Sequence, residues 1–171
     1  MIFKNIKHSF KLWKNTFYLK RKYDVLIEKS VTIKYPDTIT IGEGSTFQSG
    51  VYIYGSRNNR LVRFGEKVVL AAGSVIYGEG GVELGDFTHI APGVIILAQY
   101  ADKRKDMGSE LPNLRYLPVK IGKGCWIGAG SIIMPGTVLG NYCVVTPNSV
   151  VYGEWGDDCK LSGNPARKAL L

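Results

Sequence analysis

Aliphatic side chains recur every six residues along most of the chain. From residue 121 onward, small residues also recur at the fifth position of each hexad. The leading residues of these hexads are Ile121, Ile127, Ile133, Leu139, Val145 and Val151. A period of six matches neither an α-helix nor the two-residue alternation of a half-buried strand. It predicts a short strand and a turn in each hexad, with three hexads closing one triangular coil of a stacked solenoid.

A coil of three hexads predicts which residues stack on one another. Each leading aliphatic residue points into a narrow core and lies on the residue 18 positions later, parallel strand on parallel strand. The predicted stacked pairs are Ile121 with Leu139, Ile127 with Val145, and Ile133 with Val151. Glycine follows the leading residue in several hexads, where a side chain would strain the turn.

The same register runs upstream, with three interruptions. The upstream hexads begin at Ile41, Phe47, Ile53, Phe64, Leu70, Ile76, Leu84, Ile90 and Ile96. Five extra residues follow the hexad at residue 53, two lie around residues 80–81, and nineteen precede residue 121. Because coils must stay stacked, we expect the extra residues to leave as loops at corners. The longest loop, residues 99–118, is of a length that is usually functional or disordered.

The first 24 residues have a different pattern. Apolar residues are spaced by three and four, with lysines between them: Phe3, Ile6, Phe10, Trp13 and Phe17. This predicts an amphipathic helix over residues 1–24, followed by the β-helix over residues 25–160 and a C-terminal tail over residues 161–171. The helix has two open roles, either capping the end of the solenoid or lying on a membrane surface.

Charge and cysteine content narrow the functional classes. Residues 1–22 carry seven of the eight net positive charges, so the remaining body is nearly neutral and a nucleic-acid-binding role is not expected. The three cysteines show no CxxC pairing and are expected as free thiols in the cytoplasm. Cys125 and Cys143 occupy inward fifth positions, whereas Cys159 lies outside the hexad register. We find no apolar run long enough to span a bilayer and no secretory signal.

The run IGKGCWIGAGSIIMPGTVLGNYCVVTPNSVV, followed by SGNPARK, resembles the hexapeptide-repeat acyltransferases. Within them it is most similar to the sugar O-acetyltransferases of bacterial surface-polysaccharide synthesis, and the resemblance covers about residues 27–168. The resemblance implies an all-β fold, a left-handed parallel β-helix of about five coils. It also implies a homotrimer with active sites between neighbouring chains, and acetyl-CoA as acyl donor without a metal.

The family's chemistry uses a histidine that removes a proton from the acceptor hydroxyl. The loop position that carries this base in the resembling enzymes is Ala101 here, and the loop holds no histidine. His89 is therefore the candidate base, with ligand positioning and a structural hydrogen bond as alternatives. Asp86 and Glu83 are near enough in sequence to orient its ring.

Three loop residues are candidates to replace the missing loop histidine. They are Tyr100, Asp102 and Asp106. Asp102 is the first of them, because it adjoins residue 101, and it would need a raised pKa to act as a base. The alternative is that this charged run is a solvated loop tip.

The resemblance also implies a set of residues along the coenzyme A cleft. Trp126 would form a wall of the cleft, and the small residues Ala129 and Gly130 would let the pantetheine arm approach the backbone. Thr146 would extend this groove by one coil. Arg167 and Lys168 would contact phosphates of the cofactor. The alternatives are trimer packing for the tryptophan, turn geometry for the small residues, and a frayed basic tail. The list of cofactor-binding candidates is Trp126, Ala129, Gly130, Thr146, Arg167 and Lys168.

Three functions follow from these observations. The leading one is acetyl transfer from acetyl-CoA to a hydroxyl of a sugar acceptor, either a small molecule or a lipid-linked glycan. N-acetylation of a nucleotide-linked amino sugar is the alternative, since a neutral amine depends less on a strong base. The third is a non-catalytic scaffold. A zinc-dependent hydratase needs three histidines, and the β-helix contains one.

Overall fold

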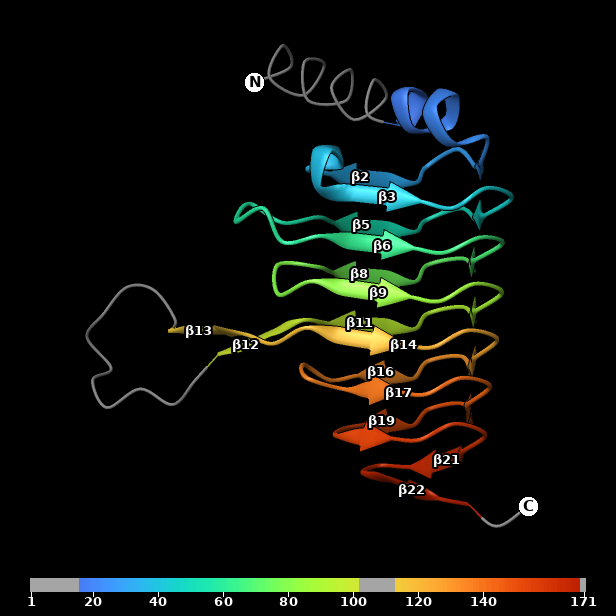
Figure 1. Ribbon diagram of the computed structural model, residues 1–171, viewed down its shortest axis with the longest axis vertical. Coiled ribbons are helices and arrows are strands. Elements are labelled where there is room, and N and C mark those ends of the chain that lie inside the picture. Colours follow the sequence, from blue (N-terminus) through green and yellow to red (C-terminus); the bar gives the residue numbers. More distant parts are fainter. Residues whose placement is uncertain (1–15, 102–112, 170–171) are drawn as a thin grey trace.

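The computed structural model describes residues 16–101 and 113–169, and this part of the chain is a parallel β-helix with three faces (Figure 1). Face 1 is an eight-stranded sheet, and faces 2 and 3 are six-stranded sheets. The strands of face 1 are β1 (Leu26–Ile27), β4 (Thr46–Phe47), β7 (Val69–Leu70), β10 (His89–Ile90), β15 (Trp126–Ile127), β18 (Val144–Val145), β21 (Lys160–Gly163) and β22 (Ala166–Lys168). The strands of face 2 are β2 (Thr32–Lys34), β5 (Tyr52–Tyr54), β8 (Val75–Tyr77), β11 (Ile95–Leu97), β16 (Ile132–Ile133) and β19 (Val150–Val151). The strands of face 3 are β3 (Ile39–Ile41), β6 (Val62–Phe64), β9 (Val82–Leu84), β14 (Val119–Ile121), β17 (Val138–Leu139) and β20 (Glu154–Trp155).

The predicted stacking register is confirmed. Strand pairs β14–β17, β15–β18 and β16–β19 are parallel. They join Ile121 to Leu139, Ile127 to Val145, and Ile133 to Val151. Faces 2 and 3 each hold six stacked strands, so the described residues form six coils where the sequence predicts about five. Val145 and Val151 of the sixth coil are predicted from the sequence. Its strand on face 3 is not, because its leading residue, Trp155, follows Val151 by four residues instead of six.

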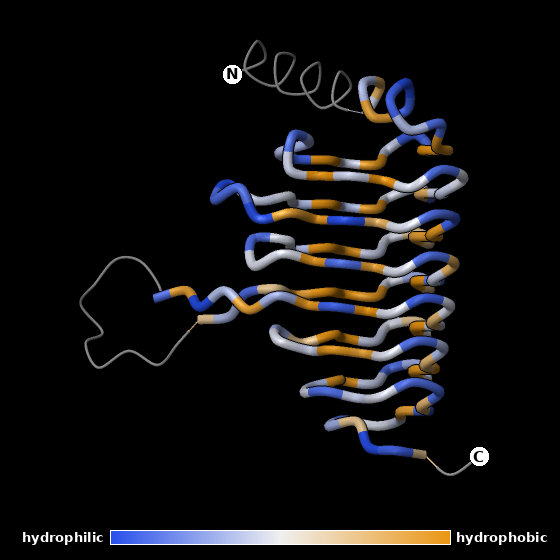
Figure 2. Tube along the Cα trace, in the orientation of Figure 1, coloured by the Kyte–Doolittle hydropathy of each residue, from blue (hydrophilic) through white to orange (hydrophobic). Residues whose placement is uncertain are grey.

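The core is a column of the leading aliphatic residues. Every leading residue from Ile41 to Val151 is at most 3% exposed, and hydrophobic stretches recur at matching places in successive coils (Figure 2). The small fifth residues also point inward, and their hydroxyl groups donate to backbone carbonyls of the next coil. Thr88 Oγ1 donates to Gly122 O at 2.8 Å, and Ser131 Oγ donates to Thr146 O at 3.0 Å. This satisfies the polar atoms that the narrow core buries.

Cys159 belongs to this inner column, which corrects its expected position outside the register. It occupies the fifth position of the hexad that begins at Trp155, and it is 5% exposed. Its Sγ lies 2.9 Å from Sγ of Cys143 in the coil before. All three cysteines are free and buried. Burial is the main cause that raises the pKa of Cys125 to about 11 and that of Cys159 to about 12.

Glycine is required where the chain turns from face 3 to face 1. A Cβ atom on Gly122 would lie 2.5 Å from Gly140 O and 2.7 Å from Asn141 N, both in the next coil. No side chain fits there, because these atoms belong to the backbone of the stacked neighbour. The glycine that follows the leading residue in the hexad pattern is thus a consequence of close coil stacking.

All three insertions leave the β-helix at the corner between faces 2 and 3. The first lies between β5 and β6, the second between β8 and β9, and the longest between β11 and β14 (Figure 1). The longest carries an antiparallel pair, β12 (Gln99–Ala101) and β13 (Leu114–Tyr116), which extends away from the solenoid as an arm. A short 3-10 helix, η1 (Pro36–Thr38), occupies the same corner in the first coil.

The described end of the N-terminal segment is helical over residues 16–23 and lies over the first coil (Figure 1). Leu19 is fully buried in the core cluster, whereas Phe17 is 53% exposed. The inward contact is therefore made by Leu19, which the three-and-four spacing of Phe3 to Phe17 did not select. The residues before position 16 lie outside the described part. None of the described helices is long and apolar enough to cross a membrane.

Residues 161–168, which the sequence assigns to a C-terminal tail, are part of face 1. Leu161 on β21 is fully buried and stacks on Val145. The chain then reverses at Asn164–Pro165, and β22 returns antiparallel to β21. The turn predicted at this proline thus folds the last basic residues back onto the sheet.

Candidate active site

His89 and Trp126 lie side by side on the outer surface of face 1. They occupy paired positions on β10 and β15, and their ring centroids are 5.4 Å apart at an interplanar angle of 70°. His89 is exposed and Trp126 is 51% exposed, because alternate residues of each strand point away from the core. The edge-to-face contact holds the two rings together on the surface.

The predicted cofactor residues continue from this pair along one edge of face 1. Gly128, Thr146 and Ser162 occupy successive coils at the corner between faces 1 and 2. Gly128 N donates to the carbonyl of Val145, the residue before Thr146, at 2.8 Å. Thr146 N donates to the carbonyl of Leu161, the residue before Ser162, at 2.9 Å. Thr146 Oγ1 donates to Ser162 Oγ at 2.8 Å, and Ser162 pairs with Arg167 on β22. The structure therefore gathers residues 126–130, 146, 167 and 168 on neighbouring coils.

Ala129 and Gly130 form the middle of a tight turn at this corner. Ser131 N donates to Gly128 O at 3.3 Å, and Gly130 has a φ of 68°. A turn with positive φ at its third residue is type II, and its second position, held here by Ala129, favours proline. The same turn in the coils before and after has proline at that position, Pro92 and Pro147 respectively.

The backbone N–H of Ala129 differs from its equivalents in the second, third, fourth and sixth coils, whereas that of Lys29 in the first coil likewise has no acceptor among the described residues. Pro92 and Pro147 have no N–H, and two earlier coils satisfy theirs with a side chain of the preceding coil. Those two bonds run from Ser49 N to Glu28 Oε2 at 2.8 Å and from Ala72 N to Gln48 Oε1 at 3.1 Å. Over residues 16–101 and 113–169, the N–H of Ala129 has no such acceptor, because Ala91 stands where the glutamate and glutamine stand. A hydrogen-bond donor is thus available three residues after Trp126.

Asp86 has a structural contact rather than a place beside the histidine. Its Oδ1 accepts a hydrogen bond from Glu66 N at 2.8 Å at the corner between faces 3 and 1. Two later coils repeat this contact. Oδ1 of Asn141 accepts from Lys123 N, and Oδ1 of Asp157 accepts from Asn141 N. Asp86 therefore belongs to a column of corner residues that link coils. No carboxylate in the described residues is hydrogen-bonded to His89.

The arm residues lie at a different corner from His89. Tyr100 is on β12 and is 42% exposed, at the corner between faces 2 and 3. Asp102 and Asp106 lie outside the described residues. Within one chain the described part of the arm and the His89–Trp126 pair are thus separated by face 2. Among the described residues, no group of three His, Cys, Asp or Glu side chains could hold a metal ion.

Comparison with known proteins agrees with the repeat and the fold. The family model of the bacterial transferase hexapeptide (six repeats) matches residues 118–153. A solved structure of a variant of AntD, an N-acyltransferase from Bacillus cereus in complex with dTDP-4-amino-4,6-dideoxyglucose and coenzyme A, is 31% identical. It matches with a TM-score of 0.76 over 86% of this chain and 80% of that chain. The chain belongs to the hexapeptide-repeat transferase family. The predicted fold, a left-handed parallel β-helix, is thereby confirmed.

This hexapeptide-repeat transferase spans different shares of the length of its curated relatives. The Mycobacterium tuberculosis protein named "Probable acetyltransferase Rv3034c" is 32% identical over 62% of this chain, and the chain spans 36% of that relative. The galactoside O-acetyltransferase of Escherichia coli is 25% identical over 82% of this chain, and the chain spans 68% of it.

The hexapeptide-repeat pattern did not single out the donor at Ala129. The signal that would have found it is a comparison down one column of the repeat, where two prolines flank an alanine. A second feature that the pattern missed is Glu79, a buried carboxylate at the corner between faces 2 and 3.

Proposed function

We propose that this protein transfers an acyl group, acetyl in the first instance, from coenzyme A to a sugar, at the surface formed by His89, Trp126 and Ala129. The observation that carries the proposal is the available N–H of Ala129, three residues after Trp126, which contacts the exposed His89. Such a surface offers a proton acceptor, an apolar wall and a donor for a carbonyl oxygen. Family membership supports the reaction class.

In the proposed O-acetyl transfer, His89 accepts the proton of the sugar hydroxyl as the oxygen attacks the thioester carbonyl. The carbonyl oxygen gains negative charge in the tetrahedral intermediate, and the N–H of Ala129 donates to it. Collapse of the intermediate breaks the carbon–sulfur bond, and the proton held by His89 passes to the leaving thiolate. One oxyanion donor of this kind contributes about a hundredfold to a thousandfold in kcat.

Coenzyme A would lie along the edge of face 1, from Trp126 across Gly130 and Thr146 to the C-terminal strand. Arg167 and Lys168 are exposed on β22 and would bind its phosphates. Arg167 Nη1 donates to Ala166 O at 2.8 Å, which leaves its other donors available to a ligand.

A homotrimer is proposed as the working form, and face 2 is the surface suited to association. In one row of the face, five of the six outward residues are apolar and partly exposed: Tyr52, Val75, Ile95, Ile132 and Val150. The sixth is Thr32. Face 3, in contrast, carries Arg63, Glu83 and Lys120 at outward positions. An apolar face of this extent on a small protein is usually covered by a partner. Association through face 2 would bring the arm of one chain toward face 1 of its neighbour.

N-acylation of a nucleotide-linked amino sugar is the second candidate. Among the described residues, no carboxylate is hydrogen-bonded to His89. This favours an amine acceptor, because a neutral amine needs less help from a base than a hydroxyl does. The structural similarity to AntD, which is named an N-acyltransferase, points the same way.

The test is an acetyl-transfer assay with a panel of sugars that offer either a hydroxyl or an amine. The O-acetyl proposal expects turnover of a hydroxyl acceptor and a loss of at least a hundredfold in kcat for His89→Ala. The N-acyl alternative expects turnover of an amino sugar that survives His89→Ala to within about tenfold. Failure of every acceptor together with absent coenzyme A binding would contradict both and favour a scaffold.

A further inference from the structure

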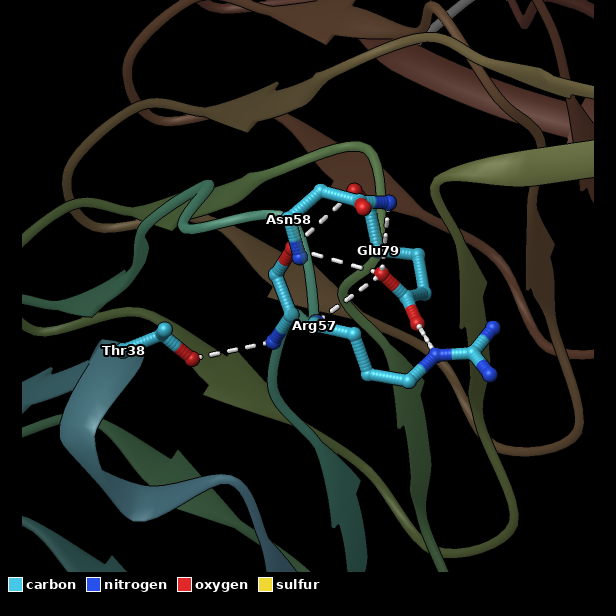
Figure 3. Close-up of polar contacts among 5 residues, drawn as sticks. Thr38, Arg57, Asn58 and Glu79 are labelled. Carbon is cyan, nitrogen blue, oxygen red and sulfur yellow. Dashed lines mark hydrogen bonds and ion pairs between the residues drawn. The ribbon is translucent and has the colours of Figure 1, made fainter.

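The insertion between β5 and β6 is held in one conformation by a buried carboxylate. Glu79 is 1% exposed, and its Oε1 accepts from Nε of Arg57 at 2.6 Å. Its Oε2 accepts from Arg57 N at 3.1 Å, Ser56 Oγ at 3.3 Å and Asn58 Nδ2 at 3.4 Å (Figure 3). Thr38 Oγ1 accepts from Ser56 N at 2.9 Å on the other side. A buried charge is tolerated only when it is paired and hydrogen-bonded, so this network fixes the loop.

The fixed loop carries Arg60 to the rim of a groove on face 3. The groove has a volume of about 340 Å³ and lies between this loop, the Gly80–Gly81 turn and the base of the arm at Pro118. Arg60 Nη1 donates to Gly80 O at 3.4 Å, and both residues line the groove. The groove is therefore built by all three insertions that leave the same corner.

The charges lining the groove are mainly positive. Arg60, Arg63 and Lys120 line it together with one acid, Glu83. Arg63, Glu83 and Lys120 are paired positions on the neighbouring strands β6, β9 and β14. Among the described residues the one ion pair within 4 Å joins Arg57 to Glu79. The three cations of the groove are thus not neutralised by direct contact with Glu83.

We propose that this groove binds the diphosphate of a diphosphate-linked sugar acceptor, an inference that rests on the proposed acyl transfer. Three cations against one carboxylate leave a net charge of +2, which matches the two negative charges of a diphosphate diester. The planar guanidinium groups of Arg60 and Arg63 suit bidentate bonds to phosphate oxygens, and Lys120 adds a point charge. The carboxylate of Glu83 accepts hydrogen bonds from hydroxyl groups of the attached sugar. The groove lies on face 3 at the base of the arm, whereas the residues proposed for coenzyme A lie on face 1, so the groove would serve the His89 surface of the neighbouring chain in the proposed trimer.

Calorimetric titration of the full chain tests the proposal. The probes are dTDP, inorganic pyrophosphate and farnesyl diphosphate, with thymidine as the uncharged control. We expect the diphosphates to bind and thymidine not to bind. The Arg63→Gln/Lys120→Gln variant should bind the diphosphates at least tenfold more weakly, because each lost charge-assisted hydrogen bond costs about tenfold or more in affinity. Lys29→Gln, which removes an exposed cation on another coil, should bind them like the wild type.

The probes also distinguish the two sources of the diphosphate. Tighter binding of dTDP than of pyrophosphate identifies a nucleoside diphosphate, and tighter binding of farnesyl diphosphate identifies a lipid carrier; both support the proposal. Absence of diphosphate binding at millimolar concentration overturns it, as does equal binding by a double variant whose thermal melting is unchanged.

Binding of acetyl-CoA, measured in the same variants, separates this inference from the proposed function. Coenzyme A itself contains a diphosphate, so the binding to compare is the acetyl-CoA binding that Arg167→Gln weakens, and we expect the double variant to retain it. If acetyl transfer is found but no diphosphate binds, the groove is wrongly assigned while the acyltransferase function stands. If diphosphates bind but no coenzyme A does, the acyltransferase function is wrong while the groove remains an anion site.

Discussion

Replacement of Ala129 by proline removes a single N–H group from the proposed active site. The flanking coils have Pro92 and Pro147 at the same turn position, so the backbone of this corner accepts proline. Within the described residues no internal hydrogen bond is lost, because the N–H of Ala129 has no acceptor there. The change in the free energy of unfolding should therefore lie within about 1 kcal/mol, with a small stabilisation from the stiffer unfolded chain.

The effect on catalysis should be much larger than the effect on stability. Loss of one donor to the oxyanion is expected to lower kcat by about 10²–10³, which corresponds to about 2.7–4 kcal/mol. Steady-state kinetics with acetyl-CoA and the acceptor found in the panel would measure this, with thermal melting as the check on folding. Ala129→Ser keeps the N–H and should retain activity.

Ala72→Pro is the matched control in the same column of the repeat. It removes the hydrogen bond from Ala72 N to Gln48 Oε1, so it should cost about 0.5–1.5 kcal/mol of stability and leave kcat unchanged. If Ala129→Pro is folded and its kcat stays within about threefold of the wild type, the N–H does not act on the reacting carbonyl and this mechanism is wrong.

Four further predictions concern the cap, the thiols and the C-terminal strand. Leu19→Ala should lower the free energy of unfolding, measured by chemical denaturation, by about 2–5 kcal/mol because it empties a fully buried position. Phe17 is half-exposed, so Phe17→Ala should change that free energy by at most about 0.5 kcal/mol. Equal losses would contradict a capping role for Leu19. Because the folded-state pKa values of Cys125 and Cys159 are raised to about 11 and 12, native protein should react with a disulfide reagent at pH 8 at least a hundredfold more slowly than unfolded protein. The same raised values mean that their contribution to stability is complete below pH 9 and is lost as the pH rises toward 12; urea titrations across this range would show no decline if the thiols were accessible. Arg167→Gln should raise the Kd for acetyl-CoA about tenfold but leave that for 3′-dephospho-CoA unchanged, and an equal effect on both would place the 3′-phosphate elsewhere.

The repeat itself could be predicted from the sequence because the physical cause is local and repeated. A leading aliphatic residue such as Ile127 must fill the core in every coil, so its spacing survives along the chain and specifies the stacked neighbour, Val145. The insertions could likewise be assigned to corners, because a stacked coil has no other place for extra residues. The face 3 strand of the last coil could not be predicted, because a shortened corner between Val151 and Trp155 shifts the register before Cys159.

The candidate site was less predictable, since it depends on contacts between coils that are far apart in sequence. The pairing of His89 with Trp126 follows from the register only after the long insertion between them has been placed at a corner. Asp86 is three residues from His89 in the sequence, yet its carboxylate is committed to Glu66 N in another coil. Proximity in sequence is a poor guide to contact on short strands that alternate with turns.

Titration of acetyl-CoA into the full chain by calorimetry measures whether face 1 and the C-terminal strand form a coenzyme A site. We expect saturable binding that weakens with 3′-dephospho-CoA and with Trp126→Ala. Absence of binding at millimolar acetyl-CoA would contradict it. The His89–Trp126 pair would then be a structural feature of a non-catalytic β-helix.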